Sequence, residues 1–157
     1  ESLWESNMDL LDPNVPLDLS QDDWKIYSRN PVMPPQYVAK DATVQNSLVA
    51  EGCNVYGEID FAVLFAGAYI APGAVVKDSI IMPGSRVEEG AVVQYAIVSE
   101  NTVIGRNAVV GARPEEIENK EEWGVTVVGA GCTVAPGAVV PPKAMVEEGT
   151  VYEEGAK

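Results

Sequence analysis

Residues 70–110 read IAPGAVVKDSIIMPGSRVEEGAVVQYAIVSENTVIGRNAVV, and this stretch decides the fold. A Val or Ile returns in it every five or six residues, at Ile70, Val76, Ile81, Val87, Val93, Val98, Ile104 and Val110. From Val76 the steps repeat as five, six and six, so equivalent positions such as Val76 and Val93 are 17 residues apart. An Ala, Ser or Thr stands two positions before each of these residues. The stretch is therefore an internal repeat with a period close to six.

The same repeat extends outward from Val38 to Tyr152. Six residues fit one short strand and one tight turn, because β-branched residues favour strands and Gly, Asn and Pro favour corners. Three sides close a coil of 17 or 18 residues, and coils stack as parallel strands about 4.8 Å apart. Residues 38–157 are therefore predicted to form an all-β solenoid of about six coils, roughly 30 Å long.

The spacing alone does not fix the handedness of this solenoid, and right-handed crossovers are the general rule for parallel strands. The motif IGRNAVV at residues 104–110, however, resembles the hexapeptide repeat of left-handed β-helices. That family is an exception to the rule. The resemblance implies a left-handed parallel β-helix.

The repeat is interrupted once, between Val110 and Val128. The inserted loop, residues 112–124, is highly charged, since seven of the ten residues at 113–122 are Arg, Lys or Glu. A solenoid accepts such an insertion at a corner. Two interpretations stay open: a binding loop or interface finger, and a solvated excursion whose return is fixed by Trp123.

Residues 1–37 have a different character. Leu3, Trp4, Met8 and Leu11 follow helical spacing, which predicts a helix over residues 1–11 that ends at Asp12-Pro13. Five prolines between residues 12 and 36 indicate an extended connector. A helix this short is marginal alone, so its apolar face is expected to pack on the solenoid or on chain upstream of Glu1.

Composition excludes several function classes. The net charge is −14, which disfavours nucleic acid and anionic membranes as partners. No apolar run reaches the ~20 residues of a membrane helix. The sequence has no histidine, which excludes His-ligated metal sites and any His general base. Corner glutamates such as Glu88-Glu89 are interpreted as solvated.

Two cysteines, Cys53 and Cys132, occupy the small-residue position of the repeat. They lie about four coils apart, near 19 Å at one strand spacing per coil, so we expect two free thiols. This cysteine usage fits a cytoplasmic protein.

A second set of aliphatic residues precedes inward-facing positions and is expected to point outward. These residues predict an exposed apolar strip and self-association of the solenoid. They are Val75, Ile80, Val92, Ile97, Val109 and Val139.

An ordered set of motifs covers almost the whole chain and resembles one family. The motifs are SLWESNMDLL at 2–11, WKIY at 24–27, PPQYV at 34–38, NSLVAEGC at 46–53, AVLFAG at 62–67, IMPG at 81–84 and AIVSEN at 96–101. In this order they resemble the C-terminal β-helix, with its preceding helix, of bacterial glucose-1-phosphate adenylyltransferases (ADP-glucose pyrophosphorylases).

The resemblance implies a parent enzyme that makes ADP-glucose and pyrophosphate from ATP and glucose 1-phosphate in glycogen synthesis. Residues 1–37 would be the end of its catalytic domain plus a connector. Mg and ATP would bind the missing catalytic domain, and this chain would hold no catalytic residue, no cofactor and no metal. Its partners would be that domain and further subunits of a tetramer, either identical or including a modulatory subunit.

Other interpretations remain open. The chain could come from another sugar-1-phosphate nucleotidyltransferase or from a modulatory subunit. A standalone hexapeptide scaffold or acyltransferase is the third alternative, but hexapeptide acyltransferases and zinc hydratases rely on histidine, which this sequence lacks.

The same family places cationic side chains for phosphorylated effectors on its β-helix. This chain has none at the five matching positions, Gly67, Tyr69, Gln94, Tyr95 and Glu100. A phosphate prefers Arg or Lys partners, so weak or absent activation by sugar bisphosphates is expected. Lys25 and Arg29 in the connector are the remaining regulatory candidates, with plain surface charge as the alternative.

Overall fold

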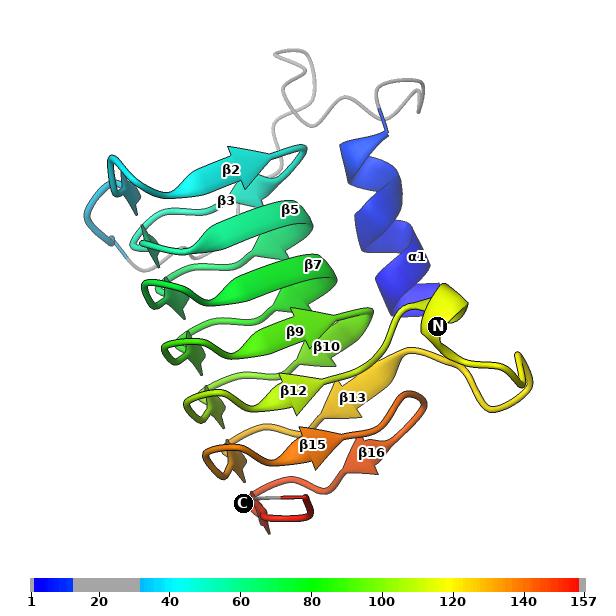
Figure 1. The fold of residues 1–157 in the computed structure, drawn as a ribbon. Coiled ribbons are helices and arrows are strands. Elements are labelled where there is room, and N and C mark those ends of the chain that lie inside the picture. Colours follow the sequence, from blue (N-terminus) through cyan, green and yellow to red (C-terminus); the bar gives the residue numbers. More distant parts are fainter. Residues whose placement is uncertain (1, 13–31, 156–157) are drawn as a thin grey trace.

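The repeat folds into a parallel β-solenoid with a short helix beside it. The computed structural model describes residues 2–12 and 32–155 of the chain. The helix α1 (Ser2–Met8) continues into a 3₁₀ turn, η1 (Asp9–Leu11), and Asp12 is already extended. These residues occupy the segment where a helix was expected. Figure 1 shows α1 lying along one side of the stacked coils.

Within the described residues, one side of the solenoid, here called the first face, is a parallel sheet of seven strands. In sheet order these are β1 (Tyr37–Val38), β4 (Asn54–Val55), β6 (Tyr69–Ile70), β8 (Arg86–Val87), β11 (Val103–Ile104), β14 (Thr133–Val134) and β17 (Val151–Tyr152). The first strand of the solenoid, β1, and the last, β17, both belong to this face. The solenoid therefore has about seven turns rather than the expected six.

The other strands form two faces that share long, bent strands. The second face contains β2 (Thr43–Gln45), the first half of β5 (Glu58–Leu64) and of β7 (Val75–Ile81), β9 (Val92–Gln94), β12 (Val109–Val110) and β15 (Val139–Val140). The third face contains β3 (Leu48–Val49), the second halves of β5 and β7, β10 (Ala96–Val98), β13 (Thr126–Val128) and β16 (Met145–Val146).

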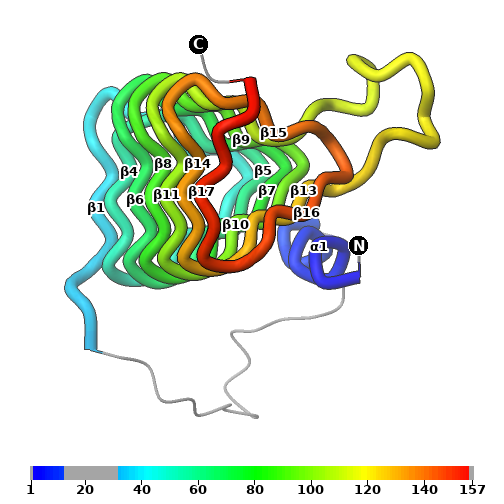
Figure 2. Tube along the Cα trace, turned by 90° about the horizontal axis from the view of Figure 1, so that it is seen from below, coloured from blue at the N-terminus to red at the C-terminus, as the bar shows by residue number. Residues whose placement is uncertain are grey.

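The coil is left-handed, as the resemblance implied. In Figure 2 the solenoid is seen from its C-terminal end, and β14, β15, β16 and β17 follow one another clockwise as the chain comes toward the viewer. The predicted fold class, a left-handed parallel β-helix with a short N-terminal helix, is therefore confirmed.

The core consists of the predicted inward residues. Those from Val55 to Val146 are all buried, whereas Val38, Val44 and Tyr152, on the terminal coils, are partly or largely exposed. Cys53 and Cys132 are both buried free thiols, as predicted from their place in the repeat. Burial raises the pKa of the Cys53 thiol, so this side chain behaves as a small packing residue.

One sequence prediction needs correction. Ile80 and Ile97 do point outward from the third face, but both are buried, because α1 covers them. Met8 packs with Val63, Ile80 and Ile97 in a second apolar cluster outside the solenoid core. Only the second-face part of the predicted strip stays accessible: Val75, Val92 and Val109 are half-buried, and Val139 is exposed.

Candidate interdomain and regulatory site

The corner between the second and third faces has an unusual backbone. We call it the α1-side corner. It contains Asn46, Phe61, Asp78 and Tyr95, whose φ angles are 42°, 50°, 46° and 46°. Bulky residues rarely adopt this left-handed conformation. The positions from Phe61 are 17 residues apart, and the next in the series is Ala112, where the chain leaves the solenoid to form the inserted loop.

Helix α1 docks at this corner through Trp4. The indole Nε1–H of Trp4 donates to the carbonyl oxygen of Asp78 at 2.8 Å. Its ring lies 5.9 Å from that of Tyr95, centroid to centroid, at an interplanar angle of 34°. Phe61 packs against the apolar cluster that Met8 completes. The left-handed corner thus turns bulky side chains toward the helix.

Loop 112–124 returns to the same corner through Trp123. The indole Nε1–H of Trp123 donates to the carbonyl oxygen of Ala112 at 2.7 Å, which closes the loop at its base. The Trp123 ring meets Tyr95 edge-on, with centroids 5.3 Å apart and an interplanar angle of 77°. Trp123 therefore does fix the return of the loop, as one of the two sequence interpretations held.

Two further contacts hold the loop. Within it, η2 (Pro114–Glu116) brings the carboxylate of Glu116 to the amide of Gln94, with Nε2 and Oε2 3.3 Å apart. On the other side, the Lys143 Nζ donates to the carbonyl oxygen of Glu121 at 2.9 Å. The loop is thus anchored to the solenoid at three points.

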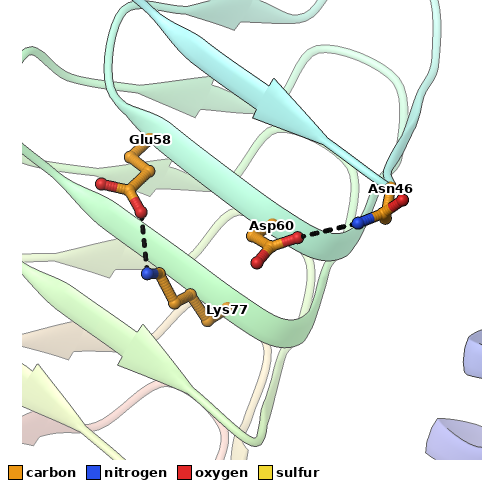
Figure 3. A network of polar contacts seen from close by, with 4 residues as sticks. All are labelled: Asn46, Glu58, Asp60 and Lys77. Carbon is orange, nitrogen blue, oxygen red and sulfur yellow. Dashed lines mark hydrogen bonds and ion pairs between the residues drawn. The ribbon is translucent and has the colours of Figure 1, made fainter.

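Carboxylates crowd the α1-side corner. The pKa of Asp78 is raised, first by burial and then by the charge of Asp60, while Arg113 and Lys77 oppose the shift and Glu115 adds to it. The pKa of Tyr95 is raised by burial and then by Asp78 and Glu115. Figure 3 shows the adjoining polar row, in which Lys77 pairs with Glu58 at 2.7 Å and Asn46 donates to Asp60 at 3.4 Å.

The five effector-matching positions do not meet on one surface. Tyr69 lies on the first face, Gln94 and Tyr95 lie at the α1-side corner, and this corner is opposite the first face in Figure 2. Gln94 is buried and its amide is engaged by Gly111 and Glu116. Lys25 and Arg29 lie outside the described residues.

The five matching positions do not include Arg86, a cation that lies beside Tyr69. The guanidinium carbon of Arg86 lies 4.1 Å from the centroid of the Tyr69 ring. Arg86 is paired with Tyr69 in the parallel register, and its Nε is 3.1 Å from a Glu88 carboxylate oxygen. The signal was available, since Arg86 follows Tyr69 by one 17-residue coil. The Glu88 carboxylate partly neutralises this cation.

The described residues contain no group of three or more His, Cys, Asp or Glu side chains placed to hold a metal ion. None of the helices in residues 2–12 and 32–155 is long and apolar enough to cross a membrane. What the corner does is join three separate segments: α1, the solenoid and loop 112–124.

The fold is that of a hexapeptide-repeat β-helix protein, and comparison with known proteins agrees with this class. Residues 34–135 match the family described as GlmU-like, C-terminal hexapeptide, and the chain belongs to that family.

The individual relatives carry a more specific name than the domain family does. The chain is 54% identical over 78 residues to a glucose-1-phosphate adenylyltransferase of Clostridium perfringens (strain 13 / Type A), covering 50% of this chain and 20% of the relative. It is 57% identical over 77 residues to the enzyme of that name from Geobacillus stearothermophilus, covering 49% and 20%. A Clostridium beijerinckii relative with the same name is 51% identical over 78 residues. The matches lie in the C-terminal part of these relatives, and the chain spans about a fifth of their length.

Proposed function

We propose that this chain is the non-catalytic assembly and regulatory domain of a glucose-1-phosphate adenylyltransferase. The observation that carries the proposal is the identity of over 50% to the C-terminal part of enzymes with that name. The parent protein would transfer the adenylyl group of ATP to glucose 1-phosphate, releasing pyrophosphate, in the cytoplasm. Mg and ATP would bind a preceding domain.

The docking of α1 supports this role. The SLWESNMDLL segment forms α1 and η1, and Met8 and Trp4 fix the helix to the solenoid. A preceding catalytic domain that continues into this helix would be held against the solenoid side that bears the α1-side corner.

An activity assay tests the proposal. The 157-residue chain and the longer protein, each at equal molar concentration, are supplied with ATP, glucose 1-phosphate and Mg²⁺, and ADP-glucose and pyrophosphate are measured. The longer protein is expected to form both, and the chain alone neither. Turnover by the chain alone would contradict the proposal. Preference of the longer protein for another nucleoside triphosphate would favour the alternative, a different sugar-1-phosphate nucleotidyltransferase.

Regulation by phosphorylated effectors is proposed to be weak. Within the described residues, two register partners of the five matching positions are cations: Arg86 beside Tyr69 and Lys77 beside Gln94. Each is paired with a carboxylate, Arg86 with Glu88 and Lys77 with Glu58. Fructose 1,6-bisphosphate, added to the longer protein, is expected to leave its rate nearly unchanged. Strong activation would show that cations elsewhere, for example Lys25 and Arg29, form an effector site.

A further inference from the structure

Among the ring contacts of residues 2–12 and 32–155, Tyr95 is the one side chain that joins both elements attached to the α1-side corner. Trp4 of helix α1 lies 5.9 Å from its ring and Trp123 of the inserted loop lies 5.3 Å from it. The two tryptophans are 119 positions apart in the sequence, and both rings contact this one residue of the solenoid.

Each tryptophan is also anchored by its indole N–H. Trp4 donates to the carbonyl oxygen of Asp78, one coil before Tyr95, and Trp123 donates to that of Ala112, one coil after it. Three successive positions of the α1-side corner, Asp78, Tyr95 and Ala112, therefore hold the helix and the loop. Asp78 and Tyr95 both have a positive φ of 46°.

We propose that Tyr95 couples the docking of helix α1 to the closure of loop 112–124. When one tryptophan packs on the ring, the ring is restricted to one position, and the second tryptophan binds it at a lower entropic cost. Groups that share a partner in this way are energetically coupled rather than additive. A change at either element is thus felt at the other.

The coupling adds a property to the loop under either sequence interpretation, a binding loop or interface finger or a solvated excursion fixed by Trp123. Its closed state depends on the helix nearest Glu1. The inference does not depend on the proposed function, since every residue in it belongs to this chain. In a longer protein, movement of the segment leading into α1 would open or close the loop.

Hydrogen exchange of the indole N–H groups tests the coupling. The chain has three tryptophans, so three indole signals are expected in a ¹H–¹⁵N spectrum, and a Trp24→Phe variant identifies the third. In Trp123→Ala, the indole N–H of Trp4 is expected to exchange about two to ten times faster, the range that one aromatic contact supports. In Trp4→Ala, the indole N–H of Trp123 is expected to accelerate by a similar factor.

Tyr95 variants decide whether the ring is the link. Tyr95→Phe keeps the ring, so both indole rates should stay near those of the native chain. Tyr95→Ala should accelerate both, and in that background loss of Trp123 should have no further effect on Trp4. Amides of Val87 and Ile104, in the core away from the corner, serve as internal controls and should be unchanged.

Three results would overturn the proposal. Trp4 exchange that is unaffected by Trp123→Ala shows that the two elements are independent. An effect that persists in the Tyr95→Ala background shows that another route connects them. Equal acceleration of the Val87 and Ile104 amides shows general destabilisation. If Tyr95→Ala fails to fold, the reciprocal pair Trp4→Ala and Trp123→Ala still decides whether coupling exists.

Discussion

At the scale of single residues, glycines in this solenoid serve two different physical purposes. Gly57 has no positive φ, but a Cβ there would overlap the carbonyl oxygen of Ala74 and lie 2.7 Å from that of Ala71. Gly131 has open space around it and a φ of +65°. The first position needs the absence of a side chain, and the second needs the left-handed backbone.

This difference predicts that asparagine is tolerated at the Gly131 position but not at the Gly57 position. Gly57→Ala is expected to lower the free energy of unfolding by about 1–3 kcal/mol or more through overpacking, and Gly57→Asn by at least as much. Gly131→Ala is expected to cost about 1–2 kcal/mol, whereas Gly131→Asn recovers most of this loss because Asn tolerates φ > 0. Urea unfolding measures all four. Equal losses for the two asparagine variants would refute the distinction.

Asp78 makes stability depend on pH. Its pKa is raised in the folded chain, chiefly by burial and then by Asp60, so the folded state binds the proton more tightly than the unfolded state. Its contribution favours folding at low pH and is lost as pH rises through the folded-state pKa.

Asp78→Asn removes this titration, and Asn is tolerated at the positive φ of the site. The gain in unfolding midpoint of Asp78→Asn over the native chain should therefore be larger at pH 7 than at pH 4. Because the two proteins are compared at the same pH, the contributions of the other carboxylates to the unfolding midpoint cancel. A difference that is the same at both pH values would mean that the Asp78 carboxyl is not perturbed.

At the scale of elements, helix α1 acts as a cover for apolar side chains. Met8 is 5% exposed and packs on Val63, Ile80 and Ile97, while Leu3 on the same helix is 49% exposed. A charge at Met8 would be buried without a partner, so it should release the helix and leave the solenoid intact.

Met8→Asp is accordingly expected to increase binding of a hydrophobic fluorescent dye, with the β-type circular dichroism unchanged. Leu3→Asp, the matched control, should behave like the native chain. Loss of the circular dichroism signal in Met8→Asp would show instead that the solenoid itself cannot fold without α1.

The elements that sequence could predict are those governed by the repeat. Spacing and residue type placed the inward residues, the coil length and the inserted loop, because each coil contacts mainly its neighbours. The docking of α1 was not predictable, because its apolar face fits any apolar surface and nothing local selects the third face. The junction of Trp4, Tyr95 and Trp123 depends on that docking. Arg86 beside Tyr69, in contrast, follows from the coil length alone.

At the scale of the whole molecule, the second face offers a surface for self-association. Val75, Val92, Val109 and Val139 are aligned in parallel register across β7, β9, β12 and β15. Such a row of accessible aliphatic side chains is typical of an interface. We propose it as the contact between copies of the domain.

Val92→Glu is expected to reduce the sedimentation coefficient at tens of micromolar, because a carboxylate would be buried in the interface. Thr133→Glu, at an exposed position on the first face, is the control and should sediment like the native chain. A native chain that already sediments as a monomer would contradict the proposal.

The central claim is that this β-helix is one domain of a longer nucleotidyltransferase. The most direct measurement is the coding sequence upstream of the Glu1 codon. We predict that it continues in frame into a nucleotide-binding domain with a Gly-rich loop. A start codon immediately before Glu1 would contradict the claim, and the function would then have to be sought in binding partners of a β-helix that stands alone.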